Sequence, residues 1–515
     1  MRLLTFLLCL LCSAANAGTY NAQANNYMFA TTRLRINTIN NVVPSGSEYF
    51  ASAVTLGTPE YPINNLTCGF MGTWIQPATT SPEVVQGNDT SLDGVSLLLN
   101  GVYYPFSPFA TSSTNWNIAS GGYLWVTVHT PNPIRQTDTV QIITTGYTPT
   151  GQNRVGAARV KPYLNEGVLY SSSSLASYLT GGTIGNGLGS GNLQYVPSPV
   201  TCVATGWDGR PVPLLYGDSI LYGNNEYINY GGPRGETGWL ERGMSSTAYG
   251  ARRYPAFNMG VASSKMADVP TTSQLQLRAA FFAALPNLPF NKVYIEGGTN
   301  DGSNSAANWE TAFNAGWTSI SATWPSAPLT QFTMPAKVTV TDQSGYTTVG
   351  GQGWTNNPWW TPSTGAGDTV NTYILTTPAP LTASLDVRPA FSGTNVGGSA
   401  NTFREDIYSI SCTISTTAVT AGQTFIKSSC PLNINTAIAV GTGTAQVEQA
   451  IVSSAPSTTS CPCQSSVFAA FANNHSIGDT IKETPTSDGT HASSTAYQRA
   501  ADEAIGFFKS SGRLQ

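Results

Sequence analysis

The hydrophobic pattern of this chain changes near Cys202, and that change limits the folds open to it. Before this point, over residues 18–195, short alternating or β-branched runs are separated by turn residues, with no convincing helix between them. Four of these runs lie at 33–36, 94–99, 122–128 and 139–143. Strands repeated at this spacing are typical of a β-sandwich. We therefore expect residues 18–200 to form a β-sandwich domain, for which carbohydrate binding is one candidate role.

After Cys202, strand patterns alternate with helix patterns. The expected strands lie at 212–216, 292–296, 331–340 and 381–387, and the expected helices at 273–285, 308–319 and 495–509. In the first helix Leu277, Phe281 and Leu285 are spaced four residues apart, which places them on one apolar stripe. Strands that alternate with helices imply a parallel sheet covered on both faces. A chain of 515 residues can bury more than one core, so we expect a second, α/β domain over residues 201–515.

The first 17 residues have the pattern of a secretory signal peptide. Met1 and Arg2 precede a short apolar run at 3–12, and Ala15-Asn16-Ala17 matches a cleavage site. The apolar run is too short to span a bilayer, and no later segment is long and apolar enough. We therefore expect a secreted or periplasmic protein with no transmembrane anchor.

Removal of that peptide leaves six cysteines: Cys68, Cys202, Cys412, Cys430, Cys461 and Cys463. An even number in an exported protein predicts disulfides. We predict only the pair Cys412 with Cys430, which flanks a short, strand-rich stretch. The Cys461-Pro462-Cys463 triplet is assigned a structural role, because no histidine or second cysteine pair lies at metal-ligand spacing. Four of the six cysteines lie in a β-rich segment at about 395–476, which we interpret as a disulfide-containing insertion or lid.

The low charge of the chain excludes some partners. Charged residues make up 10% of the sequence and the formal net charge is −4, so there is no basic field to hold nucleic acid or an anionic membrane. A hydrophobic fraction of 40% provides enough apolar surface to offset the entropy of ordering, which excludes a disordered chain.

Two short motifs follow expected strands of the α/β domain. Gly217-Asp218-Ser219 comes directly after the strand at 212–216 and before a helix start, a turn that holds a serine at the carboxyl edge of the sheet. Gly298-Thr299-Asn300-Asp301 follows the strand at 292–296, and the Asn300 amide could donate to an oxyanion from the same edge. The two motifs predict a nucleophilic serine with a nearby amide donor.

A third motif, Asp488-Gly489-Thr490-His491, stands immediately before the last helix. An aspartate three residues before a histidine can hold the imidazole tautomer whose Nε2 accepts the serine proton. Of the three histidines, only His491 has a carboxylate at this spacing, because His129 follows Val126 and His475 follows Ala472. We predict His491 as the general base and assign His129 a structural role.

These three motifs, together with Asn258-Met259-Gly260, resemble the four sequence blocks of the SGNH (GDSL) hydrolase family, in the family's order. The resemblance covers residues 206–508. It implies a flavodoxin-like three-layer α/β/α domain that hydrolyses esters, with Ser219, His491 and Asp488 as the catalytic triad. It also implies an oxyanion hole made by the backbone N–H groups of Ser219 and Gly260 and the side chain of Asn300. Ile220 stands where the family's first block ends in leucine, which is a conservative difference.

These roles predict a Ser-His-Asp acyl-enzyme mechanism with no metal or organic cofactor. A tryptophan cluster, Trp354, Trp359 and Trp360, lies among polar residues in an expected loop and is a candidate platform for sugar rings. The alternative is that these tryptophans anchor the loop in a core. Together with the low charge and the β-sandwich, the cluster favours an O-acetyl ester on a polysaccharide or other glycan as substrate.

Two other functions stay open on the sequence alone. One is a carbohydrate-binding or adhesion protein on a hydrolase scaffold that has lost its activity. The other is a lipid esterase or lysophospholipase, for which we would expect an apolar entrance to the active site.

Overall fold

The computed structural model describes most of the chain. It describes residues 27–31, 34, 48–75, 83–109, 116–154, 158–159, 161, 164–184, 195–223, 234–271, 273–302, 305–337, 339–340, 352–353, 358–361, 365–391, 411–432, 437–442, 444, 446–454, 461–484, 486, 491–492 and 494–515. The expected signal peptide and the expected strand at 33–36 are outside the described residues, apart from Leu34.

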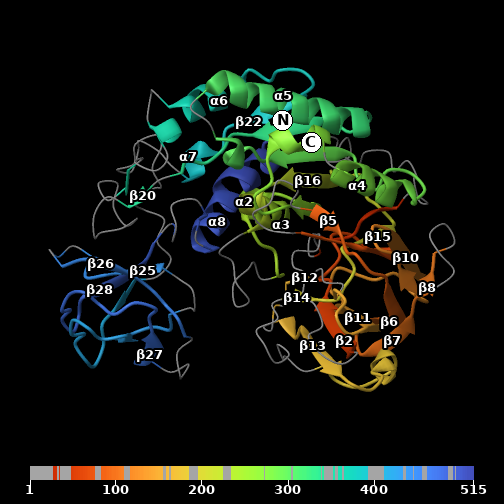
Figure 1. The fold of residues 1–515 in the computed structure, drawn as a ribbon, viewed down its shortest axis with the longest axis horizontal. Helices are drawn as coiled ribbons and strands as arrows, with labels where there is room; N and C mark the ends of the chain where they lie inside the picture. The colour runs from red at the N-terminus through yellow and green to blue at the C-terminus, as the bar shows by residue number, and fades with distance from the viewer. Residues whose placement is uncertain are drawn as a thin grey trace, which may run out of the picture.

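Two antiparallel sheets form the N-terminal part of the chain (Figure 1). One has the strand order β1-β15-β3-β10-β8 and the other β13-β2-β11-β6-β7. The strands of the first sheet are β1 (Met28–Phe29), β15 (Thr201–Thr205), β3 (Asn64–Met71), β10 (Tyr123–Val128) and β8 (Ser107–Pro108). Those of the second are β13 (Gly167–Ser171), β2 (Glu48–Thr55), β11 (Val140–Thr148), β6 (Thr90–Leu99) and β7 (Val102–Pro105).

Inward-facing residues from both sheets share one apolar core, which makes this unit a β-sandwich. Leu66 and Val126 enter that core from the first sheet, and Leu97 and Ile142 enter it from the second. The strand β15 lies beyond the boundary expected at residue 200 and belongs to the sandwich. It is also linked to β3 by a disulfide between Cys202 and Cys68, which are paired in the strand register.

The α/β unit has a five-stranded parallel sheet with the order β17-β16-β18-β19-β22. Its strands are β16 (Pro213–Gly217), β17 (Phe257–Gly260), β18 (Lys292–Glu296), β19 (Leu329–Phe332) and β22 (Ala383–Leu385). Numbered along the chain this order is 2-1-3-4-5, which is the flavodoxin-like arrangement. In such sheets, ligands bind at the carboxyl ends of the strands where the order reverses, here at β16 and β18.

Both faces of this sheet are covered by helices (Figure 1). Successive residues of β16 point to opposite faces, so Leu214 enters one core and Leu215 enters the other. The first core contains α4 (Ser273–Ala283), α5 (Ala306–Thr323) and α6 (Ala366–Leu375). The second contains α3 (Trp239–Ser245) and the C-terminal segment α8 (Ser494–Ala500), η9 (Ala501–Gly506) and α9 (Phe507–Ser510).

One expected strand is shorter than the sequence suggested. The run at 331–340 was expected to form a single strand, but β19 ends at Phe332 and β20 (Thr339–Val340) pairs with β21 (Gln352–Gly353) outside the main sheet. Pro335 lies between the two pieces, and proline has no N–H for a central strand to use. The expectation of one continuous strand there was wrong.

The β-rich insertion is a small unit with its own apolar core. Its four-stranded sheet consists of β23 (Ser411–Thr413), β28 (Thr480–Glu483), β25 (Ala437–Val440) and β26 (Glu448–Ile451), while β24 (Phe425–Ser428) pairs with β27 (Cys463–Ser466). The predicted disulfide between Cys412 and Cys430 is confirmed, and Cys461 is bonded to Cys463. The strands extend to Glu483, past the end expected at residue 476.

The sandwich and the α/β unit share an aromatic core. Trp125 of β10 is fully buried and stacks on Phe281 of α4, with ring centroids 4.3 Å apart, and its Nε1 donates to the Phe281 carbonyl at 3.0 Å. Phe29 of β1 contacts Phe257, Phe282 and Phe290 of the α/β unit. This sandwich face is therefore covered by the α/β unit and is not free to bind a glycan.

Candidate active site

Ser219 is held at the carboxyl edge of the sheet by a tight turn from β16 into the short helix α2 (Ser219–Tyr222). Asp218 is the N-cap of this helix, and its Oδ1 accepts a hydrogen bond from the Ile220 N–H at 2.9 Å. A side chain at Gly217 would overlap the Glu296 carbonyl on the neighbouring strand, so the turn requires glycine at this position. Ser219 is 7% exposed, which leaves its hydroxyl at the edge of the packed core.

His491 comes from the other end of the chain and meets this serine. Its Nε2 lies 2.8 Å from the Ser219 Oγ, a hydrogen-bond distance across 272 residues of sequence. The His491 backbone is also fixed, because its carbonyl accepts a hydrogen bond from the Thr486 hydroxyl at 2.7 Å. The structure therefore brings together the nucleophile and base that the sequence predicts.

The third predicted member of the triad, Asp488, is outside the described residues. The other two histidines make different contacts. The Nδ1 of His129 lies 2.6 Å from Asn65 Oδ1 in the sandwich, and the Nε2 of buried His475 lies 2.7 Å from Glu448 Oε1 in the insertion. These contacts place both rings away from Ser219.

Asn300 lies in a single turn of 3₁₀-helix, η5 (Thr299–Asp301), just past the end of β18. Its Nδ2 donates to the Ser264 carbonyl at 3.1 Å, which uses one of the two amide hydrogens. Among the described residues, no acceptor is found for the other amide hydrogen, which could therefore bond a ligand. Ser219 is the first residue of α2, so its backbone N–H is among those that a helix leaves without an intrahelical acceptor.

Gly260 is the last residue of β17 and is paired in register with Gly217. Its N–H, however, donates to the Asn258 Oδ1 at 2.8 Å. The Asn258 side chain also donates to the Leu221 carbonyl and to Glu241, so it fastens α2, β17 and α3 together. An oxyanion role for Gly260 requires its hydrogen bond to Asn258 to open, and that role stays a prediction.

Two buried carboxyl groups near Ser219, those of Asp218 and Glu296, were not predicted from the sequence. Asp218 is fully buried, and burial raises its pKa although the charges of Lys337 and His491 oppose the rise. Glu296, at the end of β18, is 1% exposed; burial raises its pKa well above the ordinary value, and the Asp218 charge adds to the increase. A carboxylate directly after the apolar run at 293–295 was the only sequence signal for Glu296.

We expect Glu296→Gln to flatten the dependence of stability on pH. As the pH rises above about 4.5, the unfolded chain releases the Glu296 proton while the folded chain keeps it, which favours unfolding. Wild-type stability should therefore lose a contribution of about 1.4 kcal/mol per pH unit until the folded pKa is reached. Urea unfolding between pH 5 and 8 measures this change. The free energy of unfolding of Glu296→Gln should increase relative to that of the wild type as the pH rises. Parallel curves for the two proteins would contradict the assignment.

Asp301 supports the loop that carries Asn300. Its carboxylate accepts hydrogen bonds from the N–H groups of Met266 and Ala267 at 2.8 and 2.9 Å. Burial raises the pKa of Asp301 to about 6, although these two hydrogen bonds favour the charged form. Asp301 thus connects the end of β18 to the segment after β17, next to the Ser264 carbonyl that Asn300 contacts.

The predicted tryptophan platform divides into different environments. Trp354 is outside the described residues. Trp360 is fully buried and packs edge-on against Trp309, so it has no ring face free for a sugar and belongs to the core. Trp359 is partly buried, and its indole lies against Gly302, next to the Asn300 loop. Of the two tryptophans that the structure describes, Trp359 is the one that stays a binding candidate.

The described part of the chain contains no cluster of three or more histidine, cysteine, aspartate or glutamate side chains arranged to hold a metal ion. Within the same residues, none of the helices combines the length and the apolar character that crossing a bilayer requires.

No sequence-family model matches this chain, and no curated protein matches it. Among solved structures, it is similar to a family two carbohydrate esterase from Clostridium thermocellum, with 11% identity, a TM-score of 0.25, and coverage of 74% of this chain and 94% of that one. A carbohydrate acetylesterase from Sinorhizobium meliloti has 14% identity and a TM-score of 0.22, over 37% and 89% of the two chains. A protein from Desulfitobacterium hafniense DCB-2, described as lipolytic and of the G-D-S-L family, has 12% identity and a TM-score of 0.25, over 39% and 87%.

Proposed function

We propose that this chain is an exported serine esterase of the SGNH type, with Ser219 as nucleophile and His491 as base. The observation that carries the proposal is the 2.8 Å contact between Ser219 Oγ and His491 Nε2 at the carboxyl edge of a parallel sheet. Three disulfides support an oxidising, extracytoplasmic location.

The first half of the reaction forms an acyl-enzyme. His491 Nε2 removes the Ser219 proton as Oγ attacks the ester carbonyl, and the carbonyl oxygen becomes an oxyanion. The Ser219 N–H and the remaining Asn300 amide hydrogen stabilise that oxyanion, and Gly260 would add a third donor if its bond to Asn258 opens. The tetrahedral intermediate then collapses, and His491 returns its proton to the departing alcohol.

Water completes the cycle in the second half. His491 removes a proton from the water molecule as its oxygen attacks the acyl carbon, and the imidazolium then gives this proton to Ser219 Oγ as the acid departs. In this proposal Asp488 orients the imidazole by accepting a hydrogen bond from Nδ1–H and stabilises the imidazolium that forms in each half.

For the substrate, we propose a short-chain ester, such as an O-acetyl group, on a carbohydrate. Trp359 supports this because its indole lies next to the loop that carries Asn300, where it could contact the sugar that bears the acyl group. The sparse charge of the chain fits a neutral, hydrated substrate better than an anionic one.

A fluorophosphonate probe tests the catalytic proposal, because it reacts only with an activated serine. We expect the wild type to become labelled at Ser219, as read by mass spectrometry of the digested protein. Ser219→Ala should remain unlabelled, while substitution of Ser263, a serine on the neighbouring loop, should leave labelling intact. A folded wild type that takes no label would instead favour a binding or adhesion protein on an inactive hydrolase scaffold.

A further inference from the structure

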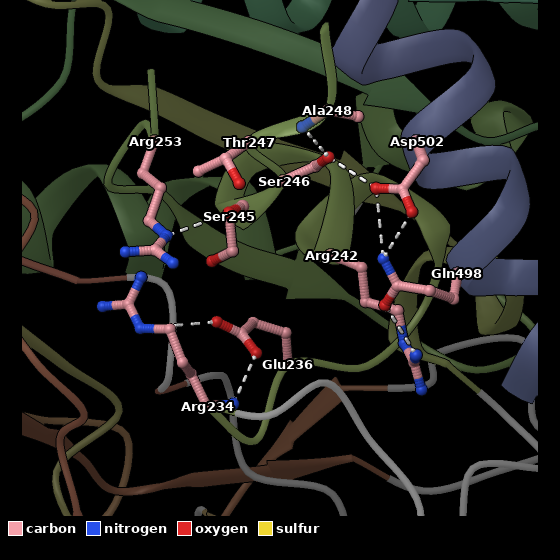
Figure 2. Close-up of a pocket in the computed structure, with 10 residues that line it drawn as sticks. All are labelled: Arg234, Glu236, Arg242, Ser245, Ser246, Thr247, Ala248, Arg253, Gln498 and Asp502. Atoms are coloured by element: carbon pink, nitrogen blue, oxygen red, sulfur yellow. Dashed lines mark hydrogen bonds and ion pairs between the residues drawn. The ribbon is translucent and has the colours of Figure 1, made fainter. Parts of the chain in front are cut away.

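A cavity of about 370 Å³ is lined mostly by polar and charged side chains (Figure 2). It is walled by the segment that follows α3 and by the C-terminal segment α8–η9. Arg253 lies on its rim, and the Arg253 carbonyl accepts a hydrogen bond from the Arg210 side chain. Arg210 lies three residues before the start of β16, whereas Ser219 follows the end of β16. A five-residue strand spans roughly 15 Å, so the cavity is distinct from the catalytic centre.

One wall of this cavity is a connected row of polar side chains. The Ser246 hydroxyl donates to Asp502 at 2.5 Å, the Gln498 amide donates to the same carboxylate at 3.2 Å, and Arg242 donates to the Gln498 oxygen at 3.0 Å. The backbone of this wall is held in place by a further hydrogen bond, which the Lys509 ammonium donates to the Ser246 carbonyl at 2.7 Å. Donors and acceptors therefore alternate on a fixed surface.

The facing wall carries Glu236 and Arg234 (Figure 2). Glu236 is 2% exposed, and one of its oxygens, Oε1, has no hydrogen-bond partner among the described residues, its nearest cation being Arg234 Nε at 3.9 Å. A buried carboxylate oxygen without a donor is costly, and a ligand hydroxyl would satisfy it. The cavity thus contains an unused acceptor in a pre-formed position.

The charges around the cavity are balanced. Its three guanidinium groups, Arg234, Arg242 and Arg253, face the carboxylates of Glu236 and Asp502, and Arg234 is also paired with Glu60 at 2.5 Å. With Glu60 counted, three carboxylates match the three guanidinium groups, and burial lowers the pKa of the nearby Lys509 ammonium to about 7, so the site has little excess charge to attract an anion. Each sugar hydroxyl both donates and accepts a hydrogen bond, so alternating donors and acceptors suit a neutral sugar.

An exposed aromatic pair borders the same cavity. Tyr249 directly follows Ala248, a lining residue, and is 63% exposed; Phe507 is 46% exposed, with its ring 6.0 Å from that of Tyr249. The backbone of Tyr249 has a φ of 56°, in the left-handed region that is unfavourable for a bulky residue. Strained backbone that presents an aromatic ring to solvent is typical of a functional surface, and such rings can stack on sugars.

We propose that this cavity is a second, non-catalytic binding site for a neutral oligosaccharide, with Arg253, Glu236 and Asp502 contacting hydroxyls and Tyr249 contacting a ring face. Its volume is in the lower part of the roughly 300–1,000 Å³ range of ligand sites. The site extends the proposed function, since it would hold a polymer while Ser219 acts on an acyl group elsewhere. It does not depend on hydrolysis.

The test is isothermal titration calorimetry of the Ser219→Ala protein with unacylated cellohexaose, xylohexaose and mannohexaose. We expect at least one to bind with a Kd of about 1 mM or lower. Arg253→Ala and Tyr249→Ala, both at exposed positions, should weaken that binding about tenfold or more. The matched controls are Arg252→Ala, the neighbouring exposed arginine, and Phe468→Ala, an exposed aromatic in the insertion; both should stay within about twofold of the parent.

Three outcomes would overturn the proposal. They are no binding of any of the three oligosaccharides, binding that is unchanged in Arg253→Ala and Tyr249→Ala, and displacement of the sugar by inorganic phosphate, which would indicate an anion site. Because the ligands carry no ester and the protein lacks its nucleophile, a failure here is separate from a failure of fluorophosphonate labelling in the wild type.

Discussion

Replacement of His491 by alanine should lower kcat for p-nitrophenyl acetate by about 10⁶, leaving only the residual rate that oxyanion stabilisation and substrate binding supply. The serine hydroxyl is a poor nucleophile unless its proton is removed as it attacks, and His491 Nε2, 2.8 Å away, is the proposed base. In the proposed mechanism the two residues act in one step, so the double variant Ser219→Ala, His491→Ala should lower kcat by no more than either single change does. Initial rates for the single and double variants, at matched protein concentration, measure this.

His129→Ala is the matched control for that experiment. It also removes an imidazole, but one that contacts Asn65 in the sandwich, so its rate should match the wild type. If His491→Ala kept more than a tenth of the activity while remaining folded by circular dichroism, His491 would not be the base. Additive losses in the double variant would argue against a shared step.

The positions of Ser219 and Asn300 could be predicted because their signals are local. A strand that ends in Gly217-Asp218-Ser219 contains its own turn, and parallel strands necessarily end at the same edge of the sheet. Asn300 follows β18, the neighbour of β16, so its position next to the nucleophile follows from strand order alone. His491 could be identified from its spacing to Asp488, although its contact with Ser219 spans 272 residues.

Features that depend on packing between distant segments could not be predicted. The hydrogen bond from Gly260 to the Asn258 side chain depends on how α2 and α3 meet β17. The complete burial of Trp360 depends on α5, which supplies Trp309. The pKa of Glu296 is raised because the helices on that face exclude water, and no local pattern reports such burial.

The sandwich strand β15 shows the same limit. Its residues, Thr201–Thr205, follow a turn-rich stretch and precede the first α/β strand, so the change in pattern assigned them to the second domain. Their hydrogen bonds go instead to β3 and β1 of the sandwich. The sheet that a short apolar strand joins depends on its pairing partner. For Cys202 of β15 that partner is Cys68, which is 134 residues away in the sequence.

Trp125→Ala should lower the free energy of unfolding of the whole chain by about 3–5 kcal/mol. The substitution leaves a cavity where a fully buried indole stacks on Phe281, and it removes the donor to the Phe281 carbonyl. Since this contact joins the sandwich to α4, we also expect the urea transition to separate into two steps, with the sandwich and the α/β unit no longer unfolding together. Tryptophan fluorescence and fluorophosphonate labelling, followed along the same titration, would report the two units.

Two further variants are controls for the Trp125→Ala prediction. Trp125→Phe keeps an aromatic ring on Phe281 and should cost less than alanine, whereas Phe468→Ala removes an exposed ring and should change stability by no more than about 0.5 kcal/mol. If Trp125→Ala unfolded at the wild-type urea concentration, the aromatic core would contribute nothing to joining the units. The sandwich would then have to be regarded as an independent module, and its covered face would be open to ligands in solution.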